Sequence, residues 1–197
     1  MANKNQQGKL FLVGLGPGEL EYLTGAALAA LKESDVIVGF RAYIEQAGDL
    51  LLGKELVSME LGQEMDRAFK AVELAYAGRV VSVVSSGDAG IYGMSGPVFQ
   101  ILNSLEWDGT NPHVETVPGI SAMQSAAALL GAPLMQDFCA ISLSDLMTPW
   151  EAITQRLKAA AQGDFVVALY NPRSRTRDWQ LLEARRILLE HRSGKTP

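Results

Sequence analysis

Cysteine and histidine are scarce in this sequence. The 197-residue chain holds one cysteine, Cys139, and two histidines, His113 and His191. A single cysteine excludes intramolecular disulfide bonds and zinc sites built from cysteine ligands, and it suits a reducing compartment. Gly-x-Ser-x-Gly and His-Glu-x-x-His motifs are also missing, which argues against a hydrolytic triad or a histidine-rich metal site. We therefore expect no bound metal.

Long apolar runs and positive net charge are missing too. No apolar segment approaches the roughly 20 residues that span a bilayer, and the opening MANKNQQGK lacks the apolar part of a signal peptide. The formal net charge is -5, whereas general nucleic-acid binding depends on an excess of Lys and Arg. We therefore expect a cytoplasmic protein that binds neither membranes nor nucleic acids.

Short apolar runs alternate with longer segments of helical periodicity, and this alternation predicts an α/β protein with mostly parallel sheets flanked by helices. The expected strands are 9–14, 35–39, 54–59, 79–86, 113–118, 138–144 and 164–171. The expected helices are 24–34, 64–78, 95–105, 121–134, 149–163 and 177–192. We predict two α/β domains, 1–130 and 137–197, joined by a linker at 131–136. The second is expected to be incomplete, because two strands leave a sheet with few partners.

The first glycine-rich turn lies in FLVGLGPGELEYLT, residues 11–24, between an expected strand and an expected helix. A dinucleotide-binding Gly-x-Gly-x-x-Gly that starts at Gly14 would need glycine at position 19, where the sequence has Glu19. Pro17 also removes an amide donor, and Glu19 and Glu21 bring negative charge to the place where a phosphate would bind. The turn is thus either a tight connection without a ligand or one wall of a binding cleft.

Three further loops follow expected strands, and ligands of parallel sheets bind at the carboxyl ends of the strands. In SSGDAGIYGMSG (85–96), Asp88 alone fits a turn-capping role, but Asp88, Tyr92 and four glycines together favour a ligand site. In VPGISAMQSAA (117–127), Ser121 is expected to cap a helix of small residues, and the loop either packs tightly or lines a ligand. LYNPRSRTRDW (169–179) concentrates arginines, which either bind carboxylates or form a solvated surface.

The motifs VGLGPG, GDAGIYG and VPGISA, in this order, resemble the tetrapyrrole methylase family, which methylates corrin and sirohaem precursors with S-adenosylmethionine. VIVGFRAYIEQ, SSGDAGIYGM, ISLSDLMTPWEAITQRL and ALYNPRSRTR are most similar to the branch that acts on C-17 of precorrin-3B or cobalt-factor III in cobalamin biosynthesis. The resemblance implies two α/β domains with the cofactor bound in the cleft between them, and a homodimer. It also implies methyl transfer to C-17 with ring contraction and lactone formation.

The resemblance also implies roles for individual residues. Pro17 is expected to border the cofactor, Ser86, Gly87, Asp88 and Ile91 to hold its methionine portion, Ser121 and Ala122 to lie on its far side, and Tyr170 to contact the adenosine. We add Tyr92 to this cofactor site because it shares the second loop with Asp88. Relatives continue beyond the point where this sequence ends, which puts the affinity for the cofactor in question.

The implied substrate carries many carboxylates, so we expect it to dock on arginines, namely Arg41, Arg173, Arg175 and Arg177. Ring contraction calls for an acid or a base, and we nominate Ser144, Asp145 and Thr148 in LSDLMTP. The alternative for these three is a capped helix start ahead of Pro149 and Trp150. Two other functions stay open. One is a methylase of the same fold acting on another tetrapyrrole carbon, a protein or RNA; the other is a non-enzymatic nucleotide-binding module.

Overall fold

The computed structural model describes residues 7–174 and 177–196. The chain divides into two compact units, Met1–Ser125 and Ala126–Pro197, so the division falls within helix α5 (Ala122–Leu129). The sequence placed the linker later, at 131–136, where the structure has a short 3-10 helix, Pro133–Met135. Among the described residues, no helix is long and apolar enough to cross a membrane.

A five-stranded parallel sheet in the order β3-β2-β4-β1-β5 forms the centre of the first unit. Its strands are β1 (Lys9–Gly14), β2 (Val36–Phe40), β3 (Glu55–Met59), β4 (Val80–Ser85) and β5 (His113–Val117). β1, β2 and β4 are buried along most of their length, as expected for continuous apolar runs in a parallel sheet that is covered on both faces. The five strands expected here are confirmed, with small shifts at their ends.

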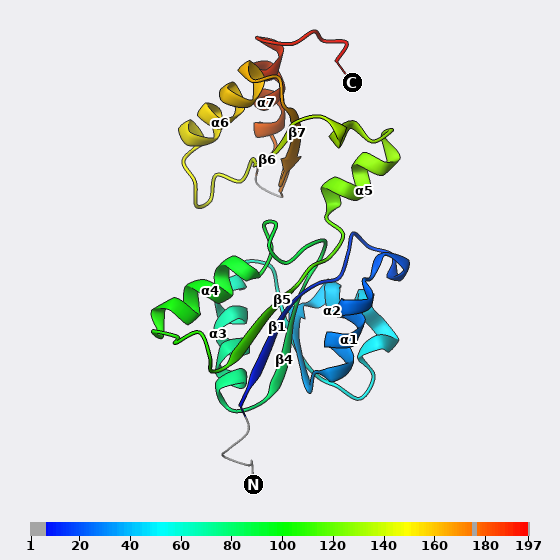
Figure 1. Cartoon of the computed structure of the whole chain (residues 1–197). Coiled ribbons are helices and arrows are strands. Elements are labelled where there is room, and N and C mark those ends of the chain that lie inside the picture. Colours follow the sequence, from blue (N-terminus) through cyan, green and yellow to red (C-terminus); the bar gives the residue numbers. More distant parts are fainter. Residues whose placement is uncertain (1–6, 175–176, 197) are drawn as a thin grey trace. The chain divides into compact units, whose positions relative to one another are not determined.

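Helices cover both faces of this sheet (Figure 1). α1 (Gly25–Glu33) and α2 (Arg41–Ala47) pack on one face against Phe11 and Val13, and α3 (Glu64–Tyr76) and α4 (Ser95–Ser104) pack on the other against Leu10 and Leu12. The sequence did not predict α2. It has seven residues and buries only Ile44 and Ala47, too short a segment for a clear helical period.

Two neighbouring strands of the sheet send their connections to opposite faces. β1 leads to α1 on one face, and the adjacent β4 leads to α4 on the other. Such a switch point leaves a crevice at the carboxyl ends of the two strands, where parallel sheets bind ligands. The topology thus places the candidate site at the loops that follow β1, β4 and β5.

The second unit contains a parallel pair, β6 (Phe138–Ser142) and β7 (Val166–Tyr170), with helices α6 (Trp150–Gln162) and α7 (Gln180–Leu189). Its apolar core consists of residues from β6, the position just after it, and both helices: Ile141, Leu143, Ile153, Leu157, Ala160, Ala184 and Ile187. Val167 and Leu169 of β7 pack against this core and are partly buried. α5 ends at Leu129, earlier than expected, because Gly131 and Ala132 take left-handed backbone conformations that no helix can continue.

Candidate cofactor and substrate site

The three glycine-rich loops of the first unit meet at the carboxyl edge of its sheet. They follow Gly14, Ser85 and Val117, the last residues of three neighbouring strands. The first two loops are joined by a backbone bridge, in which the Gly87 amide donates to the Gly16 carbonyl at 2.7 Å and the Gly16 amide donates to the Gly87 carbonyl at 3.0 Å. The rim of loops expected from the sequence is therefore formed within this unit.

Glycine is required at this rim because the backbones approach each other closely. A Cβ on Gly119 would lie 2.2 Å from the Gly87 carbonyl oxygen, and a Cβ on Gly14 would lie 2.6 Å from the same oxygen. Gly87 itself has a φ of +64°, in the left-handed region that favours glycine. Gly14 and Gly119 thus allow the loops to approach each other.

The Asp88 carboxylate links the second loop to the third. Its Oδ1 accepts a hydrogen bond from the Gly90 amide at 2.8 Å, and its Oδ2 accepts one from the Gly119 amide at 3.0 Å. The first bond is the turn-capping role that the sequence left open. A carboxylate has about four lone-pair sites, so Asp88 also retains acceptor capacity for a ligand.

Ser121 begins helix α5 with a reciprocal capping box. Its Oγ accepts from the Gln124 amide at 3.2 Å, and the Gln124 Oε1 accepts from the Ser121 amide at 3.0 Å. The Ser121 hydroxyl also lies 3.1 Å from the same oxygen. The predicted capping role of Ser121 is confirmed, and its amide and hydroxyl are both engaged in the helix start.

The other residues assigned to the cofactor in this unit lie in the same loops. Pro17, Ser86 and Ile91 are half-buried, and Ala122 and Tyr92 are exposed. Tyr92 has a φ of +53°, a conformation that is uncommon outside glycine and costs free energy. A buried hydrogen bond holds the loop that carries Tyr92, because Ser85 Oγ accepts from the Met94 amide at 3.0 Å.

Arg67 is a residue at this edge that sequence reasoning missed. It is 3% exposed, its Nη2 donates to the Glu60 carbonyl at 2.8 Å, and its Nη1 lies 3.3 Å from Met94 Sδ. Burial lowers the pKa of its guanidinium. Its spacing from Ala71 and Ala75 places Arg67 on the buried face of α3. This helical periodicity is the sequence signal from which its burial could have been predicted.

In the second unit, the structure corrects the role expected of Arg177. The side chain is buried, and its Nη1 donates to the carbonyls of Leu143 and Asn171, both at 2.8 Å. Its Nε lies 3.7 Å from Asp145 Oδ1. These contacts argue against substrate docking by Arg177, because the guanidinium satisfies carbonyls at the ends of two strands instead.

Of the other three arginines expected to dock the substrate, the structure describes two. Arg173 is exposed in the loop after β7. Arg41 is exposed at the start of α2 and pairs with Glu60 at 3.1 Å. Arg175 lies outside the described residues.

The three residues nominated for ring contraction lie in the loop between β6 and α6. The Asp145 Oδ2 accepts from Gln180 Nε2 at 3.1 Å, so this carboxylate is held by both Gln180 and Arg177. The Ser144 amide donates to Ser142 Oγ at 3.2 Å, and Thr148 is half-buried. Pro149 occupies the N-cap position of α6 and provides no side-chain cap. The three residues thus lie in one loop. The start of α6 has no side-chain cap, unlike the alternative considered from the sequence.

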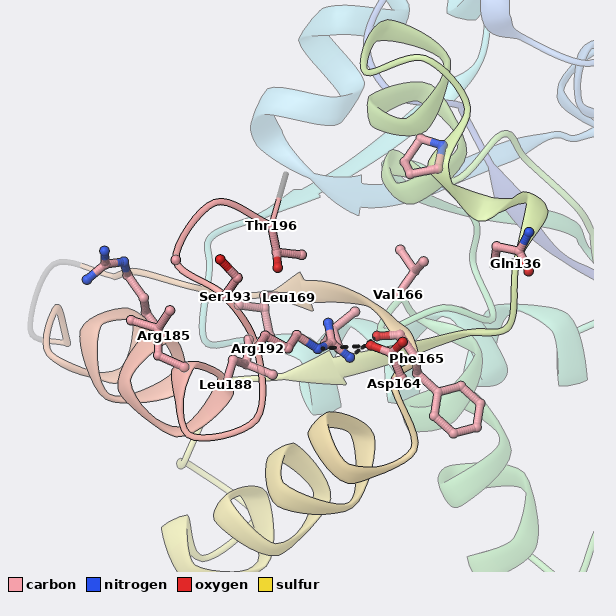
Figure 2. A pocket seen from close by; sticks show the side chains of 14 residues that line it. Gln136, Asp164, Phe165, Val166, Leu169, Arg185, Leu188, Arg192, Ser193 and Thr196 are labelled. Carbon is pink, nitrogen blue, oxygen red and sulfur yellow. Dashed lines mark hydrogen bonds and ion pairs between the residues drawn. The ribbon is translucent and has the colours of Figure 1, made fainter.

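A pocket of about 570 Å³ lies elsewhere in the second unit, beside β7 and α7 (Figure 2). Val166, Leu169 and Leu188 are among its apolar lining residues. Arg192 in its wall donates to the Phe165 carbonyl, and its Nε pairs with Asp164 at 3.6 Å. None of the residues assigned to the cofactor, substrate or catalysis lines this pocket.

Comparison with known proteins identifies the family. The sequence profile of the Tetrapyrrole (Corrin/Porphyrin) Methylases matches residues 9–197. The chain belongs to this family. It is 50% identical over 192 residues to the cobalt-factor III methyltransferase of Priestia megaterium, covering 97% of this chain but 36% of that protein. It is 43% identical over 188 residues to the probable cobalt-factor III C(17)-methyltransferase of Salmonella typhimurium, covering 95% of this chain and 77% of that protein.

Solved structures agree with the family. The crystal structure of the methyltransferase CobJ matches with a TM-score of 0.88 and 43% identity, over 94% of this chain and 77% of that one. A uroporphyrin-III C-methyl transferase from Thermus thermophilus, solved with S-adenyl homocysteine, matches with a TM-score of 0.65 and 26% identity, over 96% of this chain and 74% of that one. The α/β tetrapyrrole methylase fold expected from the sequence is confirmed.

Proposed function

We propose that this chain catalyses methylation of C-17 of a corrin precursor, precorrin-3B or cobalt-factor III, with S-adenosylmethionine as the methyl donor. Ring contraction and lactone formation would accompany the transfer, as a step of cobalamin biosynthesis. The observation that carries the proposal is the 50% identity to a cobalt-factor III methyltransferase across 97% of this chain. The likeness in fold to the methyltransferase CobJ agrees with the proposal.

The loops of the first unit suit a cofactor that carries no phosphate. The segments 14–18, 85–93 and 117–122 contain neither lysine nor arginine, and Pro17 offers no amide donor. S-adenosylmethionine has an ammonium group and a sulfonium, and the Asp88 carboxylate retains lone pairs toward such a cation. We assign to the cofactor the residues Pro17, Ser86, Gly87, Asp88, Ile91, Tyr92, Ser121, Ala122 and Tyr170.

Bound S-adenosylmethionine supplies an electrophilic methyl group on a positively charged sulfur. On transfer to the ring carbon, the electron pair of the broken sulfur–methyl bond would stay on sulfur, and the ring would balance the charge that it gains by releasing a proton. The protein's own contribution is alignment and exclusion of water, for which the loops joined by Gly16, Gly87 and Asp88 provide a fixed framework.

Arg41 and Arg173 are our proposed docking groups for the substrate carboxylates, because both are exposed. Ser144, Asp145 and Thr148 remain our proposal for the acid and base groups of ring contraction. Of these, Asp145 already has an arginine partner, Arg177. We also propose that the protein works as a homodimer in the cytoplasm.

The proposal is tested by offering the protein several methyl acceptors together with S-adenosylmethionine. Separate samples receive precorrin-3B, cobalt-factor III, other tetrapyrroles, RNA or protein, and each acceptor is examined by mass spectrometry. We expect one added methyl on precorrin-3B or cobalt-factor III only. A methyl on RNA or protein would favour the rival methylase function. Cofactor binding without any methylated acceptor would instead indicate a binding module.

A further inference from the structure

Two loops in the second unit contact each other at three places. We call them the rim loops: residues 143–149, after β6, and the described residues among 171–179, after β7. Beside the strands, Asn171 Nδ2 donates to Ser142 Oγ at 3.0 Å. At the far ends, the rings of Trp150 and Trp179 meet edge to face with their centroids 4.7 Å apart. Arg177 holds the middle.

Arg177 is suited to this position because one side chain reaches both loops. Its Nη1 bonds the Leu143 carbonyl on the first loop and the Asn171 carbonyl on the second, while its Nε faces Asp145. Arg177 is only 8% exposed, so water reaches this place poorly. Loss of the guanidinium would therefore leave the two carbonyls without a hydrogen-bond donor. A lysine has a single nitrogen, so it cannot bond the two carbonyls and face Asp145 with separate donors as Nη1 and Nε do.

Tyr170 lies where the second rim loop leaves its strand. Tyr170 is the last residue of β7, and its carbonyl accepts a hydrogen bond from the Leu143 amide at 2.9 Å. The next residue, Asn171, takes a φ of +50° and is held by both Ser142 and Arg177. Arg177 therefore bonds both the residue that follows Tyr170 and the residue whose amide binds the Tyr170 carbonyl.

We propose that Arg177 is a positioning residue for the cofactor site: it contacts no ligand itself but holds the rim loops so that Tyr170 can contact the adenosine. The inference rests on the proposed function, since it assumes that Tyr170 belongs to the cofactor site. Asp145 and Gln180 complete the arrangement from the side of the first rim loop and α7.

The test measures binding of S-adenosylhomocysteine by calorimetry to the wild-type chain and its variants. Arg177→Gln is expected to raise the Kd about tenfold, since misplacing one binding contact costs on the order of one hydrogen bond. Arg177→Lys keeps the charge and part of the bonding, so its Kd should fall between the two. Arg186→Gln is the matched control, because Arg186 lies exposed on α7 of the same unit and pairs only with Glu183 and Glu190 among the described residues.

A second measurement separates positioning from stability. Near-ultraviolet circular dichroism of the Trp150–Trp179 pair reports the rim loops directly, and thermal unfolding reports stability. We expect Arg177→Gln to change the tryptophan signal and the Kd together in samples that are fully folded. A lowered Tm with a wild-type Kd would show that Arg177 only stabilises the unit, and would overturn the inference.

Two further outcomes are informative. If Arg177→Gln does not fold, Arg177→Lys decides, and a wild-type Kd in the lysine variant would refute the positioning role. If the wild-type chain itself fails to bind S-adenosylhomocysteine, the proposed function fails and the inference falls with it. If the wild type and Arg177→Gln bind S-adenosylhomocysteine with equal Kd, the positioning role of Arg177 is refuted but the proposed function is not.

Discussion

The Asp88 carboxylate accepts a hydrogen bond from the Gly119 amide at 3.0 Å and so joins the loops after β4 and β5. Arg177 does the equivalent in the second unit, where it joins the loops after β6 and β7 through the Leu143 and Asn171 carbonyls. In each unit, one charged side chain satisfies backbone groups of the opposite polarity beyond the carboxyl ends of strands that belong to one sheet. The residues that looked most like ligand-binding groups in the sequence thus also build the loops.

Replacing Asp88 should weaken cofactor binding through the geometry of the loops. In Asp88→Asn, one carboxylate oxygen becomes an NH₂ donor, which then faces the amide of Gly90 or Gly119 instead of accepting from it. Loss of one such bond costs about 1–2 kcal/mol, so the Kd for S-adenosylhomocysteine should rise roughly tenfold. Calorimetric titration measures this change.

Asp108→Asn is the matched control for Asp88→Asn. Asp108 also accepts from backbone amides, those of Thr110 at 2.8 Å and Asn111 at 3.0 Å, but it precedes β5 and so lies at the opposite edge of the sheet. Its replacement should leave the Kd for S-adenosylhomocysteine unchanged. Equal weakening by both variants would mean that general destabilisation explains the result at Asp88.

A methyl group at Gly119 should destabilise the first unit strongly. The new Cβ would lie 2.2 Å from the Gly87 carbonyl oxygen, which belongs to backbone and cannot swing away. We expect Gly119→Ala to lower the free energy of unfolding by about 3 kcal/mol, the size of severe overpacking. Urea denaturation followed by circular dichroism gives the value.

Gly96→Ala is the comparison for this loss. Gly96 lies in the first turn of α4, and a Cβ there meets no atom within 4 Å. Alanine should be neutral or should add about 0.5 kcal/mol, because glycine is the poorer helix former. Similar losses in Gly119→Ala and Gly96→Ala would contradict the close approach of the loops.

The stability contributed by Asp108 should depend on pH. Amide hydrogen bonds from Asn111, together with the Thr110 side chain, lower the pKa of Asp108 from 3.8 to about 2. Because the pKa is lower in the folded state, the stabilisation is fully present above the unfolded pKa and is lost as pH falls through about 2. Asp108→Asn should therefore be less stable than wild type at neutral pH, and the difference in Tm should shrink on acidification. A difference that stays constant down to that pH would refute this assignment.

Salt should weaken binding of the tetrapyrrole more than binding of the cofactor. Arg41 and Arg173 are exposed, and attraction between exposed charges is screened within about 10 Å at 0.1 M salt. The KM for the tetrapyrrole should rise with salt, while the Kd of S-adenosylhomocysteine changes little. Charge-removing Arg41→Gln and Arg173→Gln should reduce the salt dependence of KM. Equal salt dependence for both ligands would count against docking on arginines.

The sequence was informative where the pattern was local. Apolar runs predicted the strands, and Ser121 with Gln124 three residues later encoded a capping box that the structure contains. It was uninformative where a residue's role depends on distant partners. Arg177 and Asp145 are 32 residues apart in the chain but form an ion pair in the structure, and no spacing rule reveals that Arg177 is buried. The need for glycine at positions 14 and 119 likewise could not be predicted, because it arises from the close approach of loops that are distant in the sequence.

The most direct test of the central claim follows a labelled methyl group. The protein is incubated with cobalt-factor III or precorrin-3B and S-adenosylmethionine whose methyl carbon is ¹³C, and the product is examined by nuclear magnetic resonance. We expect the label on C-17 of a ring-contracted product. A labelled methyl on another carbon of the macrocycle, or transfer to neither substrate, would contradict it.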